Sequence, residues 1–233
     1  MSIKTLSWNM YYGSVHQTTP CQRFNRIMTI ANTFQVDLVF LQEHPGLSSQ
    51  LTDQTGRLHG ISPIPSDYNY HVIPEMDHYI TDRVSASNRA YALLIKNTCQ
   101  LSDVGYFNQS QFVNHPKLRS YLRCPVHYKI KHLGITYNIF NWHNEIGNLA
   151  KTGMKIFTRQ TMPNNTILLG DLNLTVNQIN RISFFNHWYD IVVNTMQIHG
   201  VDHILSKQLS HPVLGNVLDF TSDANHFPIA GDI

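Results

Sequence analysis

The spacing of apolar residues changes along the chain between the two-residue period of a strand and the longer period of a helix. Residues 3–9 alternate apolar and polar side chains, which predicts a strand. Residues 36–41 are almost continuously apolar, as expected of a strand buried on both faces. A turn at Leu133-Gly134 separates two further strand-like runs, 126–130 and 135–140, and indicates a hairpin. The remaining predicted strands are 91–95, 166–169, 201–205 and 227–229.

Helical periodicity is confined to two segments. The Thr18-Thr19-Pro20 sequence is typical of a helix start, and apolar residues follow it at helical spacing. These apolar residues are Phe24, Ile27, Met28, Ala31 and Phe34. A second helix is predicted near 144–160, whereas 46–82 is rich in Gly, Pro, Ser and Asp and indicates a long excursion with short elements. Strands outnumber helices, a pattern that favours two sheets packed face to face with helices outside.

Composition adds broad limits to this picture. A chain of 233 residues that is 42% apolar suits a single domain, residues 1–233, with a full hydrophobic core. The net charge of +2 and pI near 8.4 permit a polyanionic ligand without requiring one. Charged residues are only 14% of the chain, and fourteen histidines add positive charge below about pH 6.5.

The cysteines and the first residues bear on the expected redox state and location of the protein. Cys21, Cys99 and Cys124 have no CxxC spacing, so a zinc site or a disulfide framework is not expected. Three buried thiols are the favoured interpretation, with a Cys99–Cys124 pair as the alternative. No apolar run is long enough to span a bilayer, and the first residues lack the pattern of a signal peptide. We therefore expect a cytoplasmic protein, with a secreted effector or toxin whose leader was removed as the alternative.

Six short segments place polar side chains at the ends of predicted strands. Carboxylates, amides and histidines at these ends are groups that bind metal ions or phosphates. Because strand ends converge in a sandwich, we expect the six segments to meet in one cleft. They are LSWN (6–9), LVFLQEH (38–44), FNWHNE (140–145), LLGDLN (168–173), VDHILS (201–206) and NHFPI (225–229).

The order WN, QE, H, GDLN, DHIL and NHFPI resembles the signature of the endonuclease/exonuclease/phosphatase superfamily, from residue 6 to residue 229. The chain is most similar to the DNase I branch, and especially to the catalytic B subunit of cytolethal distending toxins. His143 in NWHNE and the segment SNRAYALLIK (87–96) carry this closer likeness. The resemblance implies an α+β fold, the four-layered αβ sandwich of two packed mixed or antiparallel sheets with outer helices.

The resemblance also implies a hydrolytic mechanism with two histidines. His143 and His226 would flank the scissile phosphate, one activating water and the other protonating the leaving oxygen. An ordinary histidine pKa near 6.5 suits both tasks at neutral pH. Asp202 would accept a hydrogen bond from the His226 ring and fix its tautomer.

A divalent metal is the implied cofactor, with Mg²⁺ expected and Mn²⁺ or Ca²⁺ as alternatives. Glu43 resembles the metal-ligating glutamate of the family, and Asn9 would support the metal and the phosphate. Asn225 stands where the family has an aspartate that helps to hold the metal, so one negative charge is missing there. Asp223, two residues earlier, is a candidate for replacing that charge.

The remaining site residues would act on water and phosphate. By the same resemblance, Asp171 and Asn173 would hold the nucleophilic water and a phosphate oxygen. Arg89 and Arg123 match basic positions in the DNase I and toxin patterns and suit the charge that develops during hydrolysis. Tyr91 is a further candidate for contact with the substrate phosphate.

Three hypotheses of function stay open at this level. The first is a DNase I-like endonuclease that cuts DNA, with partner chains for delivery if it is toxin-like. The second is a phosphoesterase acting on a phosphoinositide or another lipid or small molecule, and the third is a weak or inactive binding protein of the same fold. A basic groove would favour DNA, exposed aromatic loops would favour lipid, and the Asn225 change would favour loss of catalysis. The candidate groove residues are Arg89, Lys117, Arg119 and Arg123, and the candidate loop residues are Tyr68, Tyr70 and Tyr79.

Overall fold

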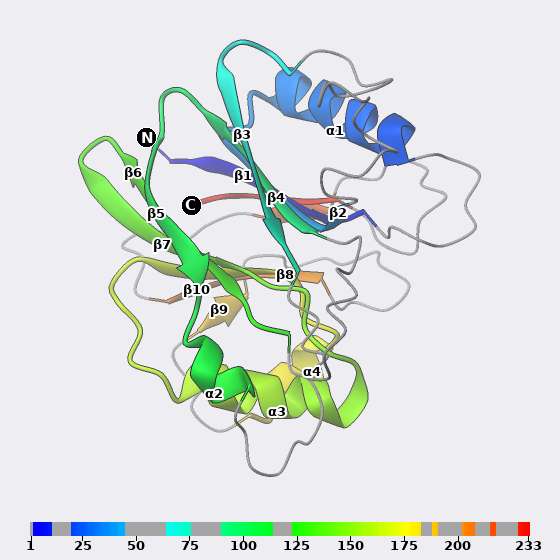
Figure 1. Ribbon diagram of the computed structural model, residues 1–233, viewed down its shortest axis with the longest axis vertical. Coiled ribbons are helices and arrows are strands. Elements are labelled where there is room, and N and C mark those ends of the chain that lie inside the picture. The colour runs from blue at the N-terminus through cyan, green and yellow to red at the C-terminus, as the bar shows by residue number, and fades with distance from the viewer. Residues whose placement is uncertain are drawn as a thin grey trace.

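Two six-stranded sheets, stacked face to face, make up the centre of the computed structural model (Figure 1). The structure describes residues 2–10, 20–44, 64–75, 90–113, 123–182, 188–190, 202–207, 215–217 and 228–233. The first sheet has the order β11 (Gly215–Val217), β12 (Ile229–Asp232), β1 (Lys4–Asn9), β2 (Leu38–His44), β4 (Ala90–Lys96) and β3 (Tyr68–Pro74). The second has the order β5 (Gln100–Tyr106), β6 (Val126–His132), β7 (Ile135–Asn141), β8 (Thr166–Asp171), β10 (Asp202–Lys207) and β9 (Tyr189–Asp190).

Helices cover the outer faces of the two sheets (Figure 1). On the first sheet lies α1 (Pro20–Phe34), and on the second lie α2 (Gln109–Val113), α3 (Gly147–Thr158) and α4 (Val176–Ile179). Both sheets are mixed, because β1 pairs with β2 and β7 with β8 in parallel, while the other neighbours are antiparallel. The predicted fold class, a layered sandwich of two sheets with outer helices, is confirmed.

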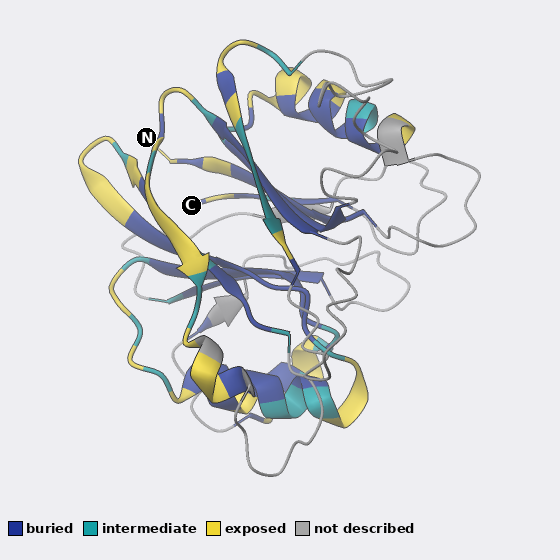
Figure 2. Cartoon of the chain, viewed as in Figure 1, coloured by how far each residue is buried: buried dark blue, intermediate teal, exposed yellow. Residues whose placement is uncertain are grey.

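Each interface between layers is a separate apolar core. Side chains from both sheets fill the centre, including Phe40 and Tyr128, whose rings meet edge to face. Phe24 of α1 belongs to the core outside the first sheet, and Phe157 of α3 belongs to the core outside the second. Figure 2 shows the result, with buried strand faces between the layers and exposed outer faces on the helices. The continuous apolar runs of β2 and β4 are explained by burial on both faces.

A buried polar bridge connects the two sheets near the C-terminal ends of β1, β2 and β7. The Gln42 side chain on β2 donates to Oδ1 of Asn141 on β7 at 2.6 Å and lies 3.1 Å from the Ser7 hydroxyl. Asn141 in turn donates to the Leu41 carbonyl at 3.2 Å. Both amide side chains are fully buried. This bridge fixes the end of β2 relative to the end of β7 in a way that apolar contacts, which have no preferred direction, do not.

Several details differ from the sequence prediction. The strand β5 was not predicted, because its side chains are largely exposed and lack an apolar alternation. The strand β3 lies within the predicted excursion, and the last helix residue of the α1 stripe, Phe34, is 46% exposed instead of buried. The proposed capping residues Thr18 and Thr19 lie outside the described residues.

The thiols of Cys99 and Cys124 are free and buried, so the alternative disulfide between them is wrong. Burial raises the pKa of Cys99 to about 11 and that of Cys124 to about 12, which makes both thiols poor nucleophiles at neutral pH. The side chain of Cys21 lies outside the described part of the chain. Among the described helices, none is long and apolar enough to cross a membrane.

Candidate active site

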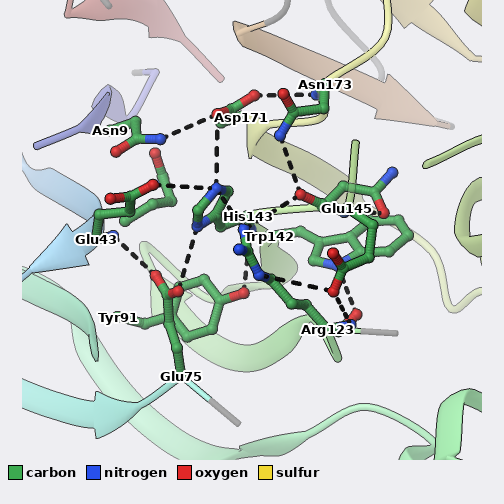
Figure 3. Close-up of polar contacts among 12 residues, drawn as sticks. Asn9, Glu43, Glu75, Tyr91, Arg123, Trp142, His143, Glu145, Asp171 and Asn173 are labelled. Atoms are coloured by element: carbon green, nitrogen blue, oxygen red, sulfur yellow. Dashed lines mark hydrogen bonds and ion pairs between the residues drawn. The ribbon is translucent and has the colours of Figure 1, made fainter. Parts of the chain in front are cut away.

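Polar side chains from both sheets meet where β1, β2, β7 and β8 end (Figure 3). Asn9 and Glu43 come from the first sheet, and His143 and Asp171 come from the second. We call these four residues together with Glu75, which follows β3, the strand-end cluster. All five side chains are buried. Asp202, the first residue of β10, is also buried and lies opposite Asp171 in the register of β10 and β8.

Asp171 is held by hydrogen bonds to both of its carboxylate oxygens. The Asn9 amide donates to Oδ2 and the Asn173 backbone N–H donates to Oδ1, each at 3.0 Å. Asn173 has a left-handed backbone, with φ of 50°, and its side chain donates to the Asn144 carbonyl at 3.0 Å. The structure thus brings Asn9, Asp171 and Asn173 together in a rigid hydrogen-bonded unit, as expected for groups that must hold a water or a phosphate oxygen in place.

His143 lies at the centre of the cluster, and its neighbours define its tautomer (Figure 3). Nε2 is 2.5 Å from Nη1 of Arg123, and Nδ1 is 3.2 Å from Oε2 of Glu75. Arginine has only donors, so Nε2 accepts in the contact with Arg123, and in that tautomer the ring proton lies on Nδ1, where Glu75 accepts it. Nε2 also lies 3.3 Å from Oε1 of Glu43 and 3.8 Å from Oδ2 of Asp171. Nε2 therefore faces both the Arg123 guanidinium and the two carboxylates that the sequence predicts, Glu43 and Asp171.

Glu75 is the main residue of this site that the sequence prediction missed. It is 3% exposed, and besides His143 its Oε1 accepts the backbone N–H of Glu43 at 2.8 Å. One carboxylate thus orients both the histidine ring and the main chain of Glu43. The sequence does contain a signal for this position, because Glu75 directly follows the strand-like sequence YNYHVIP inside the predicted excursion.

Arg123 is held beside His143 by Glu145, a second residue that received no predicted role. Oε1 of Glu145 accepts the Arg123 backbone N–H at 3.1 Å and lies 3.7 Å from Nε of Arg123. The Trp142 indole donates to the Arg123 carbonyl at 2.9 Å. The guanidinium therefore lies at the cluster, as its predicted contact with phosphate requires.

Tyr91 has a different place from the one predicted. Its side chain is 1% exposed, and its hydroxyl accepts the backbone N–H of His143 at 3.1 Å. Burial, and secondarily the Glu75 carboxylate, raises the pKa of Tyr91 well above its usual value. Tyr91 therefore supports the main chain under His143 and does not face a substrate.

Three predicted site residues, Arg89, Asn225 and His226, lie outside the described residues, so the pairing of Asp202 with His226 stays a prediction. The same holds for Tyr79, Lys117 and Arg119.

Tyr68 and Tyr70 belong to strand β3, where Tyr68 is buried and Tyr70 is half-buried. Their interpretation as exposed aromatic loops is therefore wrong.

The donor groups of the cluster fit a hydrated magnesium ion better than a metal enclosed by protein ligands. Within the described ranges, no three His, Cys, Asp or Glu side chains form a group that could hold a metal by themselves. However, Glu43 and Asp171 supply oxygen donors close to the same atom, at 3.3 and 3.8 Å from Nε2 of His143. Mg²⁺ is commonly bound through one or two carboxylates while it keeps several waters. Among the described residues, the buried carboxylates of Glu43, Glu75 and Asp171 each lie within 3.8 Å of a His143 ring nitrogen, a concentration of oxygen donors that suits a cation.

Solved structures share this fold over nearly the whole chain. D. rerio TDP2 complexed with a single-strand DNA product has a TM-score of 0.66 and 11% identity, covering 99% of this chain and 98% of that chain. An endonuclease/exonuclease/phosphatase family protein from Bacteroides thetaiotaomicron has a TM-score of 0.67 and 16% identity, covering 100% of this chain and 94% of that chain. The mannosyl-6-phosphatase Bt3783 from the same organism has a TM-score of 0.63 and 16% identity, covering 99% of this chain and 98% of that chain.

The sequence itself matches no family model and no curated protein. These similarities therefore show the fold alone, and the closer likeness to a toxin subunit stays a prediction.

Proposed function

We propose that this chain is a Mg²⁺-dependent phosphoesterase that hydrolyses phosphodiester bonds in DNA. The observation that supports it best is the environment of His143, whose Nδ1 faces a buried carboxylate while Nε2 faces the ends of both sheets. With Nδ1 bonded to Glu75, Nε2 is the ring nitrogen that can exchange a proton with the other groups of the site. General acid–base hydrolysis requires that arrangement.

Glu75 keeps the ring of His143 ready for proton transfer. By accepting the Nδ1 proton it prevents the other tautomer, and its negative charge favours the imidazolium that forms when Nε2 takes a proton from water. The proton on Nε2 is then available for a later transfer to an oxygen. In the predicted mechanism His226 performs the complementary transfer on the other side of the phosphate.

The phosphate itself would be held by the remaining residues of the site. The Arg123 guanidinium lies next to Nε2 of His143 and suits a nonbridging oxygen. Glu43, with Asn9 and Asp171, would hold Mg²⁺, which supplies charge stabilisation at the nonbridging and leaving oxygens. Because Asp171 is anchored by Asn9 and Asn173, its carboxylate needs little reorganisation when substrate binds.

Two substrate classes besides DNA are compatible with this chemistry, a lipid phosphoester and a small-molecule phosphoester. A lipid-acting enzyme needs exposed apolar or aromatic loops, but Tyr68 lies in the core and Tyr70 packs against Phe24 and His44. A small phosphomonoester is the second candidate, because the mannosyl-6-phosphatase has the same fold at similar coverage. DNA remains the first, since a TDP2 of this fold is known with a DNA product.

Nicking of supercoiled plasmid tests the proposal directly. The purified protein should nick the plasmid with millimolar Mg²⁺ and stop with excess EDTA. His143→Ala should lower turnover by roughly two to four orders of magnitude, the usual contribution of a positioned acid–base group. His132→Ala is a matched control, because His132 lies at the opposite end of β6 and β7, where it pairs with Ile135.

The same preparations should be tested on mannose 6-phosphate and on a phosphoinositide. Faster hydrolysis of the sugar phosphate, equally sensitive to His143→Ala, would keep the chemistry and replace DNA as substrate. Plasmid nicking that His143→Ala leaves unchanged, or a complete lack of Mg²⁺-dependent hydrolysis, would overturn the proposal.

A further inference from the structure

The backbone of Glu43 has an unusual conformation that its own strand does not explain. Leu41 pairs with Ala92 and His44 pairs with Ala90, so Gln42 and Glu43 together oppose a single residue of β4. This is a β-bulge, which redirects side chains at a strand end. Glu43 has φ of 48°, in the left-handed region that residues with a Cβ seldom adopt. Surrounding contacts must therefore hold it there.

One of these contacts is the hydrogen bond from the Glu43 backbone N–H to Oε1 of Glu75, at 2.8 Å. A second set of contacts lies on the other side of the bulge, at His44. The His44 ring is fully buried, and its Nε2 lies 2.7 Å from the Tyr70 hydroxyl. Phe24 meets both rings edge to face, with centroids 5.7 Å away in each case.

Tyr70 is the donor in its hydrogen bond with His44. Burial raises the pKa of Tyr70 above its usual value, so the phenol keeps its proton and donates a hydrogen bond to Nε2 of His44. The contact is therefore a structural hydrogen bond.

We propose that Tyr70 and His44 are positioning residues, which hold the bulge at the end of β2 so that the Glu43 carboxylate is directed at the metal. This inference rests on the proposed function in taking Glu43 as a metal ligand. It follows from connectivity, because His44 is covalently next to Glu43 while its ring is fixed between Tyr70 and Phe24. The strand β3 thus orients Glu43 from both sides, through Tyr70 within the strand and Glu75 directly after it.

Tyr70→Phe removes the donor and leaves the ring, so it tests the hydrogen bond without a cavity. Tyr68→Phe is the matched control, because Tyr68 is in the same strand and its hydroxyl donates to the Val36 carbonyl, away from Glu43. Metal binding is measured without substrate, by titrating free Mn²⁺ with electron paramagnetic resonance and displacing it with Mg²⁺. Tyr70→Phe should weaken binding by roughly 10- to 100-fold, the usual effect of losing a residue that orients a ligand. Tyr68→Phe should change it less than about twofold, and Glu43→Gln should abolish it, which identifies the site.

A second readout needs no metal. In EDTA, amide hydrogen exchange of the segment 41–44 should become faster in Tyr70→Phe and stay at the wild-type rate in Tyr68→Phe. Equal metal affinities and equal exchange rates in the two variants would overturn the inference. If the wild type binds no metal, the proposed function fails, and the exchange rates alone then decide whether Tyr70 anchors the bulge. Faster exchange in Tyr70→Phe supports that anchoring, and equal rates refute it.

Discussion

Glu75→Gln is the most informative single change at the site, because it keeps the size of the side chain and alters only its hydrogen-bonding capacity. The Glu75 carboxylate accepts two N–H groups, from the Glu43 backbone and from Nδ1 of His143. A glutamine has one accepting oxygen and one NH₂ donor, so it satisfies only one of them. The other N–H then faces a donor in a buried environment.

Either orientation of the new amide damages the site. If its oxygen accepts from Glu43, the NH₂ faces Nδ1 and favours the tautomer with the proton on Nε2. That tautomer removes the accepting nitrogen from the side of the ring that faces Arg123, Glu43 and Asp171. If the oxygen accepts from His143 instead, the Glu43 N–H loses its acceptor and the bulge is released. We expect kcat to fall by roughly two to four orders of magnitude, which corresponds to about 3–5 kcal/mol in the activation free energy.

The assay is plasmid nicking at saturating Mg²⁺, with circular dichroism and thermal unfolding as checks on the fold. Glu145→Gln is the matched control, since it also replaces a carboxylate by an amide close to His143 but contacts Arg123 instead of the ring. It should raise KM and change kcat less than about tenfold. A Glu75→Gln variant that keeps kcat within threefold of the wild type would refute the assigned role of Glu75 and the inferred tautomer.

Three further predictions concern a backbone position beside Trp142, the pH dependence of stability and the need for a metal. Gly170→Ala should destabilise the protein by at least about 3 kcal/mol in urea unfolding, because its φ is +123° and a Cβ there would lie 2.2 Å from the Trp142 carbonyl oxygen. The control is Gly105→Ala, which should not destabilise the protein in this way, because no atom lies within 4 Å of the new Cβ. Burial of His127, which stacks on Phe140, lowers its pKa, so the unfolded chain takes up a proton first as the pH falls. The free energy of unfolding should therefore decrease below about pH 6.5, and His127→Gln should show a smaller decrease between pH 7 and pH 5 in urea titrations. Excess EDTA should abolish nicking without unfolding the protein, and cleavage that persists in chelator would remove the metal from the mechanism.

The part of the fold that the sequence predicted is the part that apolar periodicity encodes. The strands β1, β2, β4 and β8 and the β6–β7 hairpin were all located within a few residues, because their side chains alternate or are continuously buried. The strand β5 has no such signal, since it is exposed on most of its length. Its position in the sheet follows from pairing with β6, which is a tertiary contact that no local pattern contains.

The site was predictable to the extent that its residues follow predicted strands. Asn9, Glu43, His143 and Asp171 all do, and the structure brings them together. Glu75 and Glu145 contact other residues of the site, so their importance depends on which side chain lies beside them in space. The local sequence around a carboxylate does not indicate which distant side chain it contacts. The sequence therefore predicts the polar groups at the strand ends and not the groups that orient them.

The site requires the two sheets to be positioned relative to each other more precisely than the fold alone requires. Glu43 belongs to the first sheet and His143 to the second, yet their side chains lie 3.3 Å apart. Apolar packing between sheets tolerates small displacements, because the hydrophobic effect depends on buried area and not on direction. The buried bridge between Gln42 and Asn141 has a fixed geometry, and these residues are respectively one and two positions before Glu43 and His143. A one-residue slip between the sheets would leave both amides buried without partners, at a cost of about 1–3 kcal/mol for each lost donor or acceptor. The interior polar pair thus makes the separation of Glu43 and His143 a consequence of folding, so that the site is assembled before any substrate or metal arrives.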